Sequence, residues 1–175
     1  MLKEKKKLYI LDILLLLVLV FLDQAAKYAA VRYLKDKTAI VLIDGVLELN
    51  YLENKGAAFG MLQNQKFFFI FVAVIFLGVM CFVLYRTPAD RKYTKLHILL
   101  IFISAGAIGN MIDRLRLDYV VDFIYFSLIN FPIFNVADVY VTVSTFILVF
   151  LILFVFRDND FYFLSFKEQR YREMR

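Results

Sequence analysis

Four long apolar runs alternate with short stretches rich in charged and polar residues. A helix crosses a bilayer with roughly 20 residues, and each run is long enough to do so with a modest tilt. We therefore predict four transmembrane helices in a single membrane-embedded domain that covers residues 1–175. The predicted spans are about 8–30, 67–85, 96–113 and 133–156.

A different pattern fills the link between the first two spans. Residues 38–52 hold two β-prone runs around Asp44-Gly45, a strong signal of a tight hairpin turn. The second run alternates apolar and polar residues, so one face of the hairpin should be half-buried. The β-prone run 120–126, before the fourth span, is suited to join the same sheet. The expected fold class is an all-α integral membrane protein with a small β-sheet, or β-cradle, outside the bilayer.

Composition supports lipid as the solvent for much of the chain. Hydrophobic residues make up 62% of the sequence, whereas a soluble domain contains about half. The net charge of +5 does not indicate nucleic-acid binding, because the Lys and Arg residues are grouped between apolar runs. Cys81 is the single cysteine and His97 the single histidine, which argues against a disulfide, a zinc hydrolase or any other metal site. We expect no cofactor.

The basic groups also predict the orientation in the membrane. Lys and Arg are dense in segments 1–7, 86–95 and 157–175, and sparser in the other two links. Cytoplasmic loops carry an excess of these residues. Both termini are therefore expected in the cytoplasm, and the hairpin on the extracytoplasmic side.

Carboxylates from separate spans are predicted to reach one depth. At 1.5 Å per residue, Asp23 lies about 22 Å along the first span and Asp113 about 25 Å along the third. Asp138 lies about 27 Å above the inner end of the fourth span. The hydrocarbon layer is about 30 Å thick, so all three approach its outer edge. Asp122 lies in the link that leads to the fourth span.

Each of these carboxylates also has a structural interpretation. Asp23 can pair with Lys27 one turn on, and Asp113 can hold a helix end in a polar knot with its neighbours. The dipole of the fourth helix favours a carboxylate such as Asp138 in its first turn. Asp122 alone would be an ordinary loop acid. An acid within the membrane nevertheless costs about 2.5–3.5 kcal/mol and needs a reason.

Two carboxylates that share a site are sufficient for peptide hydrolysis. One ionised group takes a proton from water, while the other, protonated, polarises the carbonyl and later protonates the leaving amine. Like charges a few ångströms apart split their apparent pKa values, so that one proton is shared near neutral pH.

Five sequence blocks then resemble the lipoprotein signal peptidase family, in the same order as in that family. They are DQAAK at 23–27, ENKGAAFG at 53–60, GAIGNMIDR at 106–114, VDFI at 121–124 and FPIFNVAD at 131–138. Together they extend from the first span to the fourth. The family pattern differs at Ser104-Ala105, where a further glycine is common, and it does not include the aromatic tail after Phe156.

The resemblance implies an aspartic peptidase of the bacterial cytoplasmic membrane, with its active site at the extracytoplasmic face. Its substrates would be prolipoproteins that carry a diacylglyceryl group on a cysteine, cut immediately before that cysteine. Asp122 and Asp138 match the catalytic pair. The expected partners are prolipoproteins, membrane lipid and the inhibitor globomycin, and the protein is expected to be a monomer. The residues expected to bind substrate or support the site are Asp23, Asn54, Gly56, Asn110, Asp113, Arg114 and Asn135.

Other functions fit the sequence less well. A serine–lysine peptidase needs an exposed serine beside a lysine, yet Ser104 and Ser144 lie within spans with no lysine at their depth. Transporter sites usually lie near the bilayer midplane on broken helices, and here the second span is apolar throughout. A structural membrane protein would tolerate Asp122→Asn and Asp138→Asn as long as it remained in the membrane.

Overall fold

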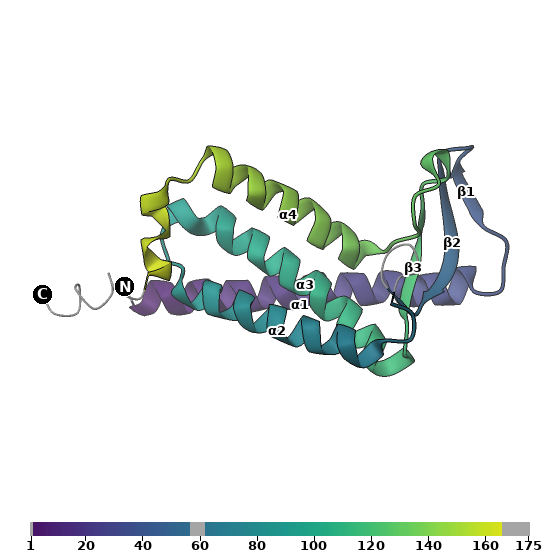
Figure 1. Ribbon diagram of the computed structural model, residues 1–175, viewed down its shortest axis with the longest axis horizontal. Helices are drawn as coiled ribbons and strands as arrows, with labels where there is room; N and C mark the ends of the chain where they lie inside the picture. Colours follow the sequence, from purple (N-terminus) through teal and green to yellow (C-terminus); the bar gives the residue numbers. More distant parts are fainter. Residues whose placement is uncertain (1, 57–61, 166–175) are drawn as a thin grey trace, which may run out of the picture.

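The computed structural model describes residues 2–56 and 62–165. Long helices run alongside one another and make up most of this part of the chain (Figure 1). Four helices are long and apolar enough to cross a membrane. They are α1 (Leu2–Leu34), α2 (Lys66–Arg86), α3 (Thr94–Leu117) and α4 (Val136–Phe154).

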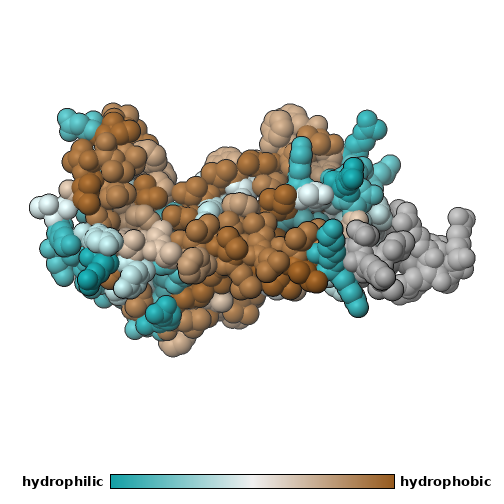
Figure 2. All heavy atoms as spheres, turned by 180° about the vertical axis from the view of Figure 1, so that it is seen from behind, coloured by the Kyte–Doolittle hydropathy of each residue, from teal (hydrophilic) through white to brown (hydrophobic). Residues whose placement is uncertain are grey.

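Helix α3 is the centre of the bundle. It packs against α1, α2 and α4 (Figure 1). In its most apolar segment 61% of the residues are buried, against 17% or less in the other three helices. The outer helices expose apolar side chains instead, which form a hydrophobic belt across the middle of the molecule, with polar residues gathered at its ends (Figure 2). A surface of this kind is stable only where lipid covers it.

A small antiparallel sheet stands across one end of the bundle (Figure 1). Its strands are β1 (Ile40–Ile43), β2 (Leu47–Asn54) and β3 (Val120–Tyr125), in the order β1-β2-β3. The turn between the first two closes with a hydrogen bond of 3.0 Å from Val46 N to Ile43 O, and Gly45 supplies the positive φ of 65°. The predicted hairpin and its third strand are therefore confirmed, as is the membrane fold class.

The sheet is anchored to the end of α1. Ala30 and Leu34 of this helix form a buried cluster with Val121 and Phe123 of β3. The second and fourth residues of β3 thus face α1. Because side chains alternate along a strand, Asp122 between them faces the other way.

The opposite end of the bundle is closed by the segment that follows α4. The short helix η4 (Asp158–Leu164) buries Phe163 against Tyr93 of η2 (Arg91–Tyr93). Arg86 Nε donates to Phe163 O at 2.8 Å, and Lys92 forms an ion pair with Asp160. The aromatic tail as far as residue 165 is therefore part of the folded structure.

Candidate active site

Asp138 is held by the first turn of α4. Asn135 caps this helix: its Oδ1 accepts from Asp138 N at 3.0 Å, and Asp138 Oδ2 accepts from Asn135 N at 3.1 Å. This reciprocal pair is a capping box, which fixes the side chain at the third helical position. Pro132 and the extended backbone of Asn135 precede the helix. The local sequence therefore determines where this carboxylate points.

Asp122 lies in the middle of β3, with a side chain that is only 2% exposed. The pairing of β2 with β3 contains a bulge between Leu49 and Leu52, after which Leu52 lies opposite Asp122. Asn54, two residues further along β2, shares this face of the sheet and donates from Nδ2 to Asp122 Oδ2 at 2.8 Å.

Three asparagine side chains join the two aspartates. Asn135 Nδ2 donates to Asp122 Oδ1 at 2.6 Å and to Asn110 Oδ1 at 3.2 Å. Asn110 Nδ2 in turn donates to Asp138 Oδ1 at 2.8 Å. With Asn54, the three amides come from β2, α3 and the N-cap of α4. The two carboxylates therefore belong to one hydrogen-bonded network.

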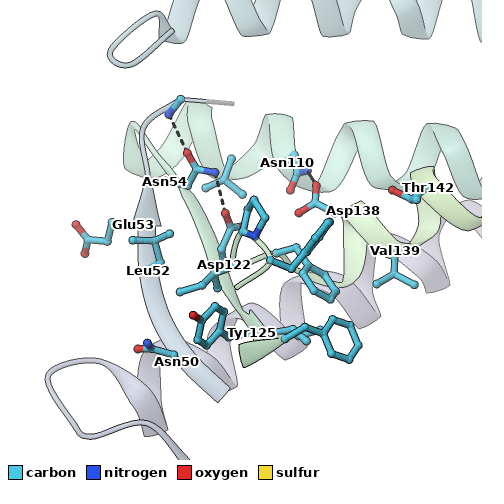
Figure 3. Close-up of a pocket in the computed structure, with 18 of the residues that line it drawn as sticks. Asn50, Leu52, Glu53, Asn54, Asn110, Asp122, Tyr125, Asp138, Val139 and Thr142 are labelled. Atoms are coloured by element: carbon cyan, nitrogen blue, oxygen red, sulfur yellow. Dashed lines mark hydrogen bonds between the residues drawn. The ribbon is translucent and has the colours of Figure 1, made fainter. Parts of the chain in front are cut away.

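Both aspartates line a cavity of about 1420 Å³ between the sheet and α4 (Figure 3). Within it Asp138 faces Asn110, and Asp122 faces Asn54. The rest of the wall is largely apolar. It includes Leu52, Ile124, Phe126, Phe131, Phe134, Val139 and Val143. The cavity therefore combines a pair of acids with room for an apolar ligand.

The surroundings of Asp122 favour its protonated form. Burial and the negative charge of Asp138 raise the pKa of Asp122 from 3.8 to about 6, although the amides of Asn54 and Asn135 oppose the shift. Asp122 can thus hold a proton at a pH where an ordinary aspartate is ionised.

We expect Asp138→Asn to lower the pKa of Asp122, because the substitution removes a like charge. Carboxyl ¹³C NMR titration of the detergent-solubilised protein measures this pKa. An unchanged or higher pKa would contradict the placement of the two carboxylates in one site.

Comparisons with known proteins identify the family of this chain. The chain is 39% identical to the lipoprotein signal peptidase of Streptococcus pyogenes serotype M5 (strain Manfredo), over 90% of this chain and 98% of that protein. The lipoprotein signal peptidase of S. pyogenes serotype M3 (strain ATCC BAA-595 / MGAS315) is 38% identical over the same shares. The sequence model of signal peptidase (SPase) II matches residues 15–154. The chain belongs to the lipoprotein signal peptidase family.

Solved structures show the same architecture. One bacterial membrane enzyme, determined at 2.3 Å resolution, superposes with a TM-score of 0.73 and 29% identity, over 81% of this chain and 87% of that one. A second, determined at 1.9 Å, gives a TM-score of 0.71 over 83% and 94% of the two chains. A lipoprotein signal peptidase is a membrane protease, and this chain is therefore an enzyme.

Several residues expected at the signal peptidase site lie on the cavity itself. Arg114 NH2 donates to Gly56 O at 3.0 Å, and the guanidinium lies 4.5 Å from the ring centre of Phe69 on α2. Gly56 N donates to Asn54 Oδ1 at 2.9 Å. Arg114 therefore connects α2, α3 and the chain that leaves β2. The remainder of the glycine-containing motif, residues 57–60, lies outside the described residues.

Asp23 and Asp113 lie behind the cavity instead of on its wall. Both are buried, and each carboxylate is 3.0 Å from the ammonium of Lys27. The predicted pair of Asp23 and Lys27 is thus present, with a second acid added from α3. Gln24 also donates to Asp113 Oδ1 at 2.9 Å.

Sequence reasoning missed the full contact set of Lys27. A lysine within an apolar span carries the same insertion cost as the aspartates, and this cost is the signal that could have marked it as a site residue. It also missed the role of Gly109, where an added Cβ would lie 2.3 Å from Asp23 Oδ2. Gly109 leaves the space that the buried ion pair occupies.

The two serine residues considered for a serine–lysine peptidase lie within helices. Ser104 donates from Oγ to Leu100 O at 2.7 Å within α3, and Ser144 is buried in α4. Among residues 2–56 and 62–165, no group of three His, Cys, Asp or Glu side chains is placed to hold a metal ion.

Proposed function

We propose that this signal peptidase removes signal peptides from prolipoproteins with Asp122 and Asp138 as its catalytic pair. The observation that carries the proposal is the link through Asn135, whose side chain donates to Asp122 and whose backbone N–H donates to Asp138. Asn54, Asn110, Arg114 and Gly56 support the pair from the walls of the same cavity. Asp23 and Asp113 support it from behind.

The chemistry needs only these two carboxyl groups and water. Asp138 takes a proton from a water molecule, whose oxygen attacks the carbonyl carbon of the scissile bond. Asp122, protonated, donates a hydrogen bond and then its proton to the carbonyl oxygen. In the tetrahedral intermediate that results, the C–N bond breaks and the proton held by Asp138 passes to the leaving amine, so the base supplies this proton and not, as the sequence led us to expect, the initially protonated acid. The products are the carboxyl end of the signal peptide and a free cysteine amine, and the proton on the new carboxyl group returns to Asp122. The raised pKa of Asp122 supports this division of roles.

The position of the pair suits a lipid-anchored substrate. Asp138 is in the first turn of a predicted span and Asp122 is in the sheet at the end of the bundle. Two acyl chains on a cysteine would hold the neighbouring peptide bond at the level of the headgroups. The apolar wall of the cavity can receive lipid beside the acids. We therefore propose that cleavage occurs immediately before a diacylglyceryl-modified cysteine.

The distribution of charge supports an active site on the extracytoplasmic face of the cytoplasmic membrane. The sheet lies at the end of the bundle opposite η4 and the start of α1 (Figure 1). Basic residues are dense at that far end, which the positive-inside rule assigns to the cytoplasm. Both aspartates and the amides that join them lie in one chain, which supports a protein that acts as a monomer.

The purified protein tests this proposal with a diacylglyceryl-modified prolipoprotein and the same prolipoprotein without lipid. We expect the modified substrate to be cut at least about 100-fold faster, because the lipid supplies binding energy that positions the bond. Mass spectrometry should identify the lipidated cysteine as the new N-terminus, and globomycin should abolish the reaction. Cleavage at another bond, or equal rates on both substrates, would contradict the proposal.

A further inference from the structure

Lys27 is a buried cation whose contacts lead to both aspartates of the proposed catalytic pair. The side chain is 3% exposed. Its ammonium lies 3.0 Å from Asp23 Oδ2 and 3.0 Å from Asp113 Oδ2, and it donates to Asn110 Oδ1 at 2.8 Å. An ammonium has three protons to donate, so all of them are used. Lys27 does not line the cavity.

Both carboxylates bound to Lys27 also hold backbone next to a proposed catalytic residue. Asp23 Oδ1 accepts from Ala137 N at 2.9 Å, and Ala137 directly precedes Asp138. Asp113 Oδ2 accepts from Val121 N at 3.1 Å, and Val121 directly precedes Asp122. Lys27 therefore joins the backbone of β3 to the backbone of α4 through two short ionic contacts.

The third contact fixes the orientation of an amide. An ammonium can only donate, so the side chain of Asn110 must present its oxygen to Lys27. The NH₂ group of Asn110 then faces away from Lys27, where it donates to Asp138 Oδ1 at 2.8 Å. If Asn110 rotated by half a turn, it would place an acceptor against the carboxylate of Asp138 and lose this hydrogen bond.

We propose that Lys27 is a positioning residue of the peptidase reaction, which sets the separation of Asp122 and Asp138 and the orientation of the Asn110 amide without touching substrate. The inference rests on the proposed function of the aspartate pair. It gives a role to a lysine that lies in an apolar span, where an exposed charge would be costly.

The charge of Lys27 also acts on the pair. The charged groups around Asp122 are Asp138 on α4, Lys27 on α1 and Arg114 on α3. Burial and Asp138 raise the pKa of Asp122, whereas Lys27 lowers it. Removal of Lys27 should therefore raise the pKa of Asp122.

The test compares Lys27→Met with Lys35→Met in the purified enzyme. Met keeps the length of the side chain without its charge or donors. Lys35 lies just after the end of α1 and pairs with Glu53 at 2.8 Å, with 40% of its side chain exposed. For Lys27→Met we expect kcat to fall about 100-fold, the effect of displacing reacting groups by about 1 Å. KM should change less than about threefold, and the pH profile of kcat should move to higher pH. Lys35→Met should leave all three unchanged.

A second variant covers the case in which Lys27→Met does not fold, because it leaves two buried carboxylates without a counter-ion. The combination of Asp23→Asn, Lys27→Met and Asp113→Asn removes all three charges. Both asparagines can still accept the backbone N–H groups of Ala137 and Val121. We expect this variant to fold, because it leaves none of these three side chains charged. Its kcat should be as low as that of Lys27→Met, because no ion pair joins the three side chains.

The outcomes separate this inference from the proposed function. A folded Lys27 variant with the kcat and pH profile of the wild type overturns the positioning role, even when Asp122→Asn and Asp138→Asn are inactive. A lower yield of folded enzyme with normal kcat per folded molecule overturns it too, since that result indicates a structural role only. Wild-type cleavage by the Asp122→Asn enzyme instead overturns the proposed function.

Discussion

Replacement of either Asp122 or Asp138 with Asn is expected to lower kcat for prolipoprotein cleavage by at least about 10³-fold, because general acid–base catalysis by a positioned group contributes about 10²–10⁴. An amide cannot take a proton from water or carry the shared proton. Asn has nearly the shape of Asp, so the cavity and the first turn of α4 should be preserved. The kcat of the purified variants, together with their abundance in the membrane by immunoblot, measures this effect.

Asp36→Asn is a matched control for these substitutions. Asp36 is exposed beyond the end of α1, and its backbone φ of 58° is a conformation that Asn also tolerates. It should cleave at the wild-type rate. If either active-site variant kept more than about a tenth of the wild-type kcat at equal abundance, the pair would not be catalytic.

The depth of the carboxylates could be predicted because an α-helix has a fixed rise. Counting along the spans placed Asp23, Asp113 and Asp138 near one level. In the structure the first two share Lys27, and Asp23 bonds to the backbone beside Asp138. The capping of α4 could also be inferred from the sequence, because Asn135 and Asp138 lie three residues apart, as a capping box requires.

The environment of Asp122 could not be predicted in the same way. Without the bulge in β2, the pairing of Leu49 with Ile124 would continue regularly and place Tyr51 opposite Asp122. Glu53, not Asn54, would then share the face of the sheet with Asp122. The one extra residue in β2 therefore decides whether the acid Glu53 or the amide Asn54 lies beside the carboxyl group of Asp122. No local pattern in the sequence indicates this bulge, whose position depends on how the strands pack against α1.

The contacts between residues of different helices could not be predicted from the sequence either. The partners of Lys27 on α3 are 83 and 86 positions away in the chain, and periodicity shows which face of a helix is apolar but not which residues meet. The segment after α4 was outside any recognised pattern, and it packs against Tyr93 and Arg86, which are distant from it in the sequence.

The close crossing of α3 and α4 leads to a prediction about stability. Gly106 faces the start of α4 so closely that an added Cβ would lie 2.4 Å from Ala137 O and 2.7 Å from Val141 Cγ2. The first of these atoms is backbone, so the helices must separate to admit a methyl group. We expect Gly106→Ala to destabilise the folded protein by about 1–3 kcal/mol, as overpacking of a core typically does. Activity should fall too, because Asn110, one turn further along α3, would move away from Asp138.

Gly78→Ala provides the comparison that isolates this clash. Gly78 lies in α2 with no atom within 4 Å of an added Cβ, so its replacement should leave packing unchanged and raise stability by up to about 1 kcal/mol through helix propensity. Thermal unfolding of both variants in the same detergent, followed by circular dichroism, gives the two shifts. Opposite signs are expected. If Gly106→Ala were as stable as Gly78→Ala, the contact between α3 and α4 would be looser than the structure has it, and Asn110 would lose the rigid support that holds it against Asp138.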